Sequence, residues 1–388
     1  MKQRTYKATG INLKAMPMGE ADKMVTVLTK ENGIVRAIAP GARKHKSRLS
    51  GRSGLFVVNE VLFIKGKSID KFVQAETQQS FPGLSRDLAK LTASQYLAEI
   101  ALAQALSDQP QEELYCLLIE HLARLERATT LNVLPCLTQA TYHLLALAGV
   151  APEVFRCCLS RAPLNPPLGD PHWQVAFSVS SGGVVAPDAI ARLERDRLQE
   201  IEPIEREWQA QLPTDRQVPD STVPDSQAAG GQAFNRQWYT QLKRKVSREV
   251  SQNLGIVAYL SGAELALMQQ LSKPELVMTA PMSTSVSNLI SSSNSISNVR
   301  LTTSPHFTPP ADRQNSLKSG TMKAAEPVPL PGSYLNSRPA LGASGPHLMW
   351  RHIEQVLRQY AQYQFDRPIK SAALIDTCFS SPTHAARA

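Results

Sequence analysis

Residues 19–41 read GEADKMVTVLTKENGIVRAIAPG, and this stretch decides the fold of the N-terminal region. Residues 24–29 are short and β-branched, Asn32-Gly33 is a hairpin signal, and residues 34–39 form the returning strand. The stretch therefore predicts an antiparallel hairpin.

Three neighbouring stretches also read as strands, namely residues 6–13, 55–64 and 71–75. Four or five short strands with tight turns within about 75 residues fit a small closed barrel better than a sandwich, which needs more chain. A barrel also removes the exposed edges that a small open sheet would leave.

The segment between two of these strands, residues 41–52, reads GARKHKSRLSGR and carries five formal positive charges. Such a loop cannot be buried, because lysine and arginine are almost never buried unpaired. It belongs to a strongly basic region: the first 74 residues hold fifteen Lys or Arg and five Asp or Glu, whereas the rest hold twenty-seven and twenty-eight. A field concentrated in this way favours a polyanionic partner such as nucleic acid.

After Pro82-Gly83 the apolar period changes to that of helices, which we predict over residues 85–107, 111–126 and 131–148. Short connections make an antiparallel bundle the expected arrangement. His121 and His143 lie in these helices, and no spacing pairs them as ligands, so we interpret them as core or surface residues.

The rest of the chain alternates between helical and irregular segments. Helices are expected over residues 189–212, over the basic stretch 238–254 and over 261–271, with a loose connection at 213–232. Residues 273–345 are rich in Ser, Thr, Asn and Pro, and we predict that they are disordered. A helix over residues 349–364 has one apolar side, so it should pack back on the bundle.

Composition excludes several classes of protein. Five scattered cysteines argue for a reducing compartment, the N-terminus has no apolar signal region, and no apolar run is long enough for a membrane span. We therefore expect a cytoplasmic protein without membrane contact. Because no catalytic constellation has a usable context, we also expect a binding protein, not an enzyme, without a cofactor.

Several of these motifs together resemble the RecO family of DNA recombination and repair mediators. The likeness rests on residues 19–29, 33–37, 40–44 and Ser47-Arg48, and covers about two thirds of the chain. It continues in Ala75-Glu76, in the first helices, in the turn Gly182-Gly183-Val184, and in the tail from Tyr360 to Arg367-Pro368-Ile369-Lys370-Ser371.

The resemblance implies an α+β, multidomain chain that begins with an OB-fold β-barrel, residues 1–80. A helical domain follows at 81–272, with a degenerate zinc-finger-like loop at about 156–189 and an insertion at about 189–255. The disordered insertion at 273–345 precedes a C-terminal helix at 346–380 that returns to the helical domain.

The resemblance also implies the function and the partners. Family members bind single- and double-stranded DNA without sequence specificity and anneal complementary strands. They work with RecR and the single-strand-binding protein to load RecA, so RecA is an indirect partner, and a nucleoid-associated location follows.

One departure from the family concerns metal. Many members hold zinc with two Cys-x-x-Cys pairs, but here only Cys157 remains in register, with Cys158 beside it; Ser160, Ala186 and Ala189 occupy the other ligand positions. Structural zinc takes four ligands. We therefore predict no metal, and expect apolar and hydrogen-bonded contacts to hold this loop.

The predicted DNA contacts are cations of the barrel region. OB barrels bind single strands in a basic groove with aromatic platforms, but Phe56, Phe63 and Phe72 are expected mostly to fill the core. Many cations with few exposed aromatics favour salt-sensitive binding of either DNA form. The expected phosphate contacts are Arg36, Arg43, Lys44, Lys46 and Arg48, followed by Lys65, Lys67 and Lys71.

Two other functions remain open from the sequence. An RNA- or ribosome-associated OB-fold protein would use the same groove. A scaffold would act through its helical domain and the Ser/Thr-rich segment, with DNA binding incidental.

Overall fold

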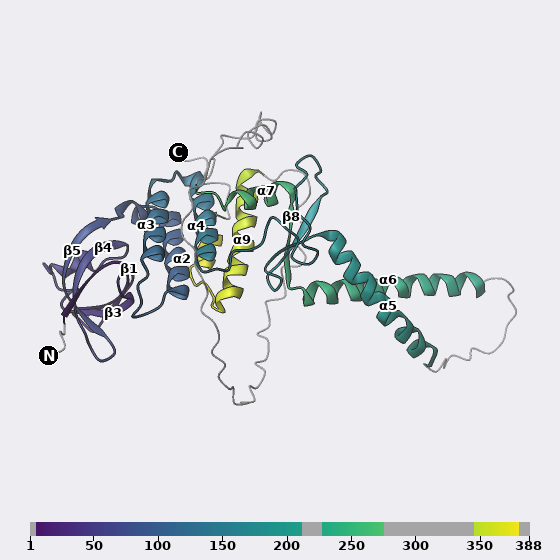
Figure 1. The fold of residues 1–388 in the computed structure, drawn as a ribbon, viewed down its shortest axis with the longest axis horizontal. Helices are drawn as coiled ribbons and strands as arrows, with labels where there is room; N and C mark the ends of the chain where they lie inside the picture. The colour runs from purple at the N-terminus through teal and green to yellow at the C-terminus, as the bar shows by residue number, and fades with distance from the viewer. Residues whose placement is uncertain (1–4, 212–226, 275–344, 380–388) are drawn as a thin grey trace, which may run out of the picture. The chain divides into compact units, whose positions relative to one another are not determined.

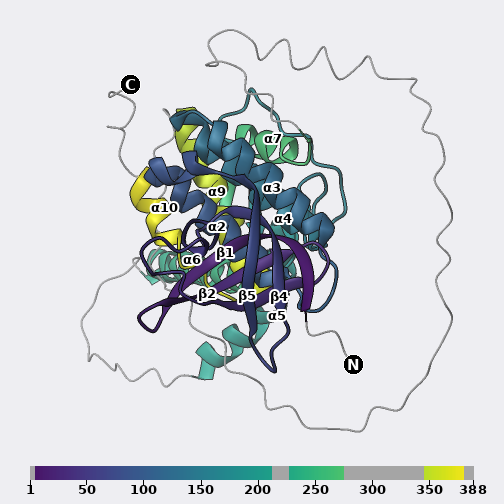
Figure 2. The ribbon, with the colours of Figure 1, turned by 90° about the vertical axis from the view of Figure 1, so that its left-hand side faces the viewer.

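The computed structural model describes residues 5–211, 227–274 and 345–379. Its N-terminal part is a closed barrel with the strand order β1-β2-β3-β5-β4, so the barrel predicted from the sequence is confirmed. Figure 2 shows β1, β2, β4 and β5 of this barrel facing the viewer. The strands are β1 (Thr5–Met18), β2 (Asp22–Thr29), β3 (Gly33–Ala39), β4 (Val57–Ile64) and β5 (Asp70–Ser80).

The interior of the barrel is filled by alternate residues of its strands, because successive side chains of a strand point to opposite faces. Val25 and Ala37 are fully buried there, together with Phe63 and Phe72. The ring of Phe63 stacks on Tyr6 and meets the edge of Phe72, with ring centroids 5.3 and 5.7 Å apart.

The helical domain is attached to the barrel near the β2–β3 turn. The amide of Ile34 donates to the carbonyl of Leu106 at 2.9 Å, and that of Gln111 donates to the carbonyl of Lys30 at 2.8 Å. One apolar cluster includes Leu28 and Phe56 of the barrel region as well as residues of the helices. The two domains therefore share a continuous core.

Three helices predicted from the sequence form the bundle: α2 (Leu88–Gln104), α3 (Glu112–Arg127) and α4 (Val133–Leu147). The side chain of Asp87 begins α2 by accepting hydrogen bonds from the amides of Ala89 and Lys90.

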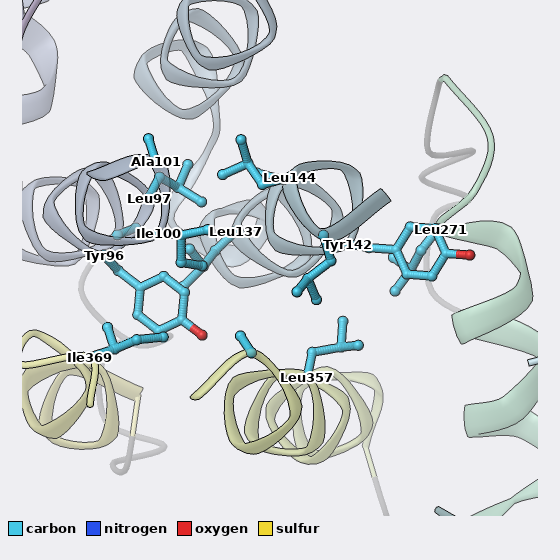
Figure 3. Packing of buried hydrophobic residues seen from close by; sticks show 14 of the residues in the cluster. Tyr96, Leu97, Ile100, Ala101, Leu137, Tyr142, Leu144, Leu271, Leu357 and Ile369 are labelled. Atoms are coloured by element: carbon cyan, nitrogen blue, oxygen red, sulfur yellow. The ribbon is translucent and has the colours of Figure 1, made fainter. Parts of the chain in front are cut away.

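The predicted return of the C-terminal region to the bundle is confirmed. α9 (Pro346–Phe365) packs against α4 and α2, as Figure 1 shows for α4. In Figure 3, Tyr96 of α2, Leu137 of α4 and Leu357 of α9 converge in the shared core. α10 (Ala372–Phe379), a separate short helix against α2, was not predicted.

A small antiparallel sheet in the order β7-β6-β8 lies beyond α4 in the chain. β6 (Gln174–Ser178) and β7 (Gly183–Val185) form a hairpin, and β8 (Ile256–Ser261) pairs with the other edge of β6. The sequence analysis assigned no strand to β8, although its β-branched and aromatic residues are typical of one. α7 (Gly262–Gln270) follows directly, as predicted.

Two long helices occupy the region between β7 and β8. α5 (Pro187–Gln211) matches its prediction, and α6 (Gln227–Asn253) contacts it, with Arg197 and Glu249 paired at 2.9 Å. α6 begins within the segment 213–232 that was predicted to be loose, so that prediction is wrong for its last six residues. The rest of that segment and residues 275–344 of the predicted disordered insertion lie outside the described residues.

The interpretation of His121 and His143 as core or surface residues holds, since His121 is buried, but the sequence did not reveal that the two rings contact each other. His121 Nε2 of α3 lies 3.1 Å from His143 Nδ1 of α4, and His143 Nε2 lies 2.8 Å from the carbonyl oxygen of Leu271. A carbonyl only accepts, so His143 carries its proton on Nε2 and accepts from His121. Burial lowers the pKa of both imidazoles, that of His121 to about 3, so the pair is neutral and structural.

Candidate nucleic-acid interface

The basic loop, residues 41–52, is anchored on the β1–β2 turn. The amide of Arg43 donates to the carbonyl of Ala21 at 2.8 Å, and that of Gly41 donates to Asp22 Oδ1 at 2.7 Å. The Arg43 guanidinium also donates to the carbonyl of Gly19 at 2.5 Å. The sequence predicted the exposure of this loop but not its attachment.

The far end of the loop is fixed as well. It contains a single helical turn, α1 (Leu49–Arg52), whose Leu49 packs against the barrel core. The buried Asn12 side chain donates to the carbonyls of Arg52 and Gly54, at 2.7 and 2.8 Å, and Asn59 also donates to Arg52 at 2.9 Å. The loop cations are therefore presented from a positioned backbone.

The loop side chains Arg43, Lys44, Lys46 and Arg48 are all exposed. Within the described ranges, none of the four pairs with a carboxylate. The backbone of Lys46 has a φ of 67°, a left-handed conformation that residues other than glycine seldom adopt. Four uncompensated cations thus lie close together along the loop.

Two more predicted contacts, Arg36 and Lys71, lie on the outer face of the barrel. Their strands run parallel with Ala37 opposite Asp70 and Ile38 opposite Lys71, and both side chains are exposed because Ala37 and Phe72 point inward. The structure therefore brings Arg36 and Lys71 together on one face.

Lys14 joins this face, although the sequence analysis did not select it. It is exposed and lies opposite Thr26, which in turn lies opposite Arg36. The predicted strand ended at Leu13, whereas β1 continues to Met18 with a register shift between Asn12 and Lys14. That bulge reverses which residues point outward, and a simple alternation of the sequence does not reveal it.

Lys65 and Lys67, in the turn between β4 and β5, form a separate group. Lys65 Nζ lies 2.9 Å from Asp108 Oδ1, and this hydrogen bond raises the pKa of the lysine. Asp108 belongs to the segment that pairs with the start of β3, whereas the basic loop follows the end of β3. The positive charge of Lys65 is therefore paired with Asp108, and this lysine lies apart from the basic loop. Lys67 is exposed.

The aromatic residues are inside, as expected. Phe56, Phe63 and Phe72 are each no more than 3% exposed, so none of them presents a ring to a base in this structure.

The degenerate zinc-finger-like loop is held by the contacts that the sequence predicted. Cys157 Sγ accepts hydrogen bonds from the amides of Ser160 and Ala186, at 3.4 and 3.2 Å, and Ala186 and Ala189 belong to its apolar cluster. Burial alone would raise the pKa of the Cys157 thiol, but the hydrogen bonds from Ala186 and Ser160 outweigh it and lower the pKa.

Zinc does not fit this donor set, because the four ligand positions supply one thiol (Cys157), one hydroxyl (Ser160) and two methyl groups (Ala186 and Ala189), with Cys158 beside them. The described residues contain no cluster of three or more His, Cys, Asp or Glu that could hold a metal ion. They also contain no helix long and apolar enough to cross a membrane.

Comparison with known proteins agrees with this architecture. The family models for the N-terminal and C-terminal parts of recombination protein O match residues 1–81 and 85–210. A DNA repair protein RecO from a Nostoc species is 40% identical over 381 residues, covering 97% of each chain. The RecO protein of Acaryochloris marina is 40% identical over 377 residues, covering 97% of this chain and 96% of its own. The chain belongs to the RecO family of DNA repair proteins.

Proposed function

We propose that this protein is a mediator of homologous recombination and DNA repair that binds single- and double-stranded DNA without reading its sequence. The observation that carries the proposal is the set of uncompensated cations on the basic loop and on the adjoining outer face of the barrel. Its phosphate contacts are Arg36, Arg43, Lys44, Lys46, Arg48 and Lys71, with Lys14 and Lys67 beside them and Lys65 as a weaker contributor because of Asp108.

Strand annealing is the activity that this surface supports best. Annealing needs two strands to approach while their mutual repulsion is neutralised and their bases stay free to pair. Cations on an exposed loop supply the neutralisation, and buried aromatics leave the bases without a strong stacking platform. No catalytic residue is required for this, so the proposed role is not enzymatic.

The partners extend this proposal. The family implies that RecR and the single-strand-binding protein act with this chain, at the nucleoid in the cytoplasm, to load RecA on coated single strands. These partners rest on family membership and not on a surface identified in the structure.

The test is annealing of complementary strands already coated with the cognate single-strand-binding protein. The intact chain should form duplex faster than the same coated strands do without it. The variant Arg43→Ala/Lys44→Ala/Lys46→Ala/Arg48→Ala should not. Equal annealing by both would remove the loop from the mechanism, and no annealing by the intact chain would contradict the mediator function.

Two further measurements distinguish the proposed function from the RNA-associated protein and from the scaffold. Tighter binding of RNA than of DNA of equal length in competition would favour the RNA-associated function. A chain lacking residues 273–345 should keep its function in cells if the protein is a mediator, and lose it if that segment recruits partners for a scaffold.

A further inference from the structure

Three apolar side chains from three different strands form one row on the outer face of the barrel. Met16 of β1 lies opposite Met24 of β2, and Met24 lies opposite Ile38 of β3. Lys71 of β5 lies opposite Ile38 and ends the row. Val73, two residues farther along β5 at a register shift, is exposed like Lys71, whereas Phe72 between them is buried.

The row and Val73 together, which we call the apolar strip (Met16, Met24, Ile38 and Val73), are not part of either core. Met16 is 42% exposed and Val73 is 43% exposed, while Met24 and Ile38 are half-buried between their neighbours. None of the four packs against the apolar clusters of the barrel or the helical domain. The strip is therefore an exposed apolar surface that the packing of the described chain does not explain.

Cations surround the strip. Lys14 and Arg36 lie in the adjacent row on either side of Thr26, two residues along the same strands, and Lys71 is at its end. On the opposite side, Arg43 is tied to the β1–β2 turn that follows Met16 and Met18. On this side the Asp22 carboxylate accepts a hydrogen bond from the amide of Gly41, and Glu20 of the same turn is exposed.

An apolar surface bordered by cations is complementary to a ligand that has flat apolar faces and a negatively charged backbone. Single-stranded DNA has both features. In a duplex the base faces are stacked on one another, so only the phosphates can contact the surrounding cations. Methionine is flexible and polarizable, and its sulfur makes favourable contacts with aromatic rings.

We propose that the apolar strip is the surface on which the bases of single-stranded DNA lie while the surrounding cations hold the phosphates. The proposal rests on the proposed function and adds its base-contacting residues. Aliphatic side chains hold a base more weakly than an aromatic platform does, so bound bases stay free to leave the strip and pair with a complementary strand.

The first test compares DNA forms in one variant. Met16→Thr/Met24→Thr/Ile38→Thr places β-branched residues, which suit strands, at all three positions and removes most of the apolar surface. It should weaken binding of a single-stranded oligonucleotide by about tenfold, with an unchanged salt dependence and unchanged binding of a duplex of the same length. Leu131→Thr, at a 66% exposed leucine of the helical domain, is the matched control and should change neither.

The second test removes the bases instead of the strip. An abasic deoxyribose-phosphate strand should bind the unchanged chain about as weakly as an intact strand binds the strip variant, and the variant should bind both strands equally. Conversely, Met16→Phe supplies an aromatic platform at an exposed position of β1. It should tighten single-strand binding several-fold and slow annealing.

Several outcomes would overturn the proposal. Equal loss of single-strand and duplex binding in the strip variant, no loss of either, or full-strength binding of the abasic strand would each exclude base contact. Normal DNA binding with loss of annealing only on protein-coated strands would instead assign the strip to a protein partner. If the unchanged chain bound no DNA at all, the proposed function itself would fail, which is a distinguishable result.

Discussion

At the scale of single residues, Glu354 of α9 is the clearest case of a side chain whose charge opposes its surroundings. It is 1% exposed, and its carboxylate, beside the buried Tyr96 hydroxyl, has no hydrogen bond of good geometry among the described residues. Arg358 lies 3.4 Å away but directs its guanidinium into two hydrogen bonds with Asp376. Burial raises the pKa of Glu354 to about 7, and Arg358 offsets only part of this effect.

The raised pKa predicts a pH dependence of stability. Between the ordinary pKa of a glutamate and about pH 7, the folded chain binds the proton that the unfolded chain releases, so stability falls as the pH rises through this window. Glu354→Gln removes this ionisation. At pH 8 the variant should be more stable than the unchanged chain, by on the order of 3 kcal/mol, and at pH 5 the two should be similar.

Thermal or urea unfolding at both pH values measures this effect. Glu113→Gln, an exposed glutamate of α3, is the control and should leave the profile of the unchanged chain intact. Parallel pH profiles for the unchanged chain and Glu354→Gln would show that Glu354 is ionised throughout.

At the scale of elements, Gly33 fixes the hairpin of β2 and β3 to the helical domain. It has a φ of +62°, and a Cβ atom at this position would lie 2.0 Å from the carbonyl oxygen of Leu106. The sequence predicted the hairpin from Asn32-Gly33 because glycine adopts this conformation readily. It could not predict the close approach of Leu106, because that contact depends on how two domains pack.

Gly33→Ala should therefore destabilise the protein by about 3 kcal/mol or more, since backbone strain adds to a clash that no side-chain movement relieves. Gly19 has a similar φ of +60° but nothing within 4 Å of the added Cβ, so Gly19→Ala should cost only about 1 kcal/mol. Urea denaturation of the two variants measures the difference. Equal midpoints would mean that the contact at Leu106 does not hold the domains together.

Strands and helices that are set by a local sequence pattern were predicted correctly, whereas several that depend on the rest of the fold were not. Local patterns placed the barrel strands and the first three helices, since hairpin signals and apolar periods belong to each segment alone. The extension of β1 past Leu13 and the short α10 were missed, because they depend on a bulge and on a distant partner. The strand β8 was missed although its residues are typical of a strand, and its pairing with β6 is not visible in the local sequence. For the same reason Lys14 escaped selection, and the pairing of Lys65 with Asp108 was not foreseen.

At the scale of the whole molecule, the positive charge is concentrated in the N-terminal part of the chain, whereas the main apolar core extends through the barrel and the helices. The first 74 residues carry all of the excess positive charge, because the rest of the chain holds about as many acidic as basic residues. The largest apolar core joins the barrel to α2, α3, α4 and α9. The return of α9 was predictable because one side of that helix is apolar, whereas its position beside α4 was not. The absence of bound zinc and the DNA contacts themselves stay predictions.

The most direct test of the central claim is the salt dependence of binding to a single-stranded oligonucleotide. The intact chain should bind at low salt, with an affinity that falls steeply as salt rises because each phosphate contact releases counterions. The variant Arg43→Ala/Lys44→Ala/Lys46→Ala/Arg48→Ala should bind more weakly, with the slope of log affinity against log salt reduced by about 2 to 3. An intact chain that ignores the oligonucleotide at low salt, or a variant with an unchanged slope, would contradict the claim that these cations hold the phosphates.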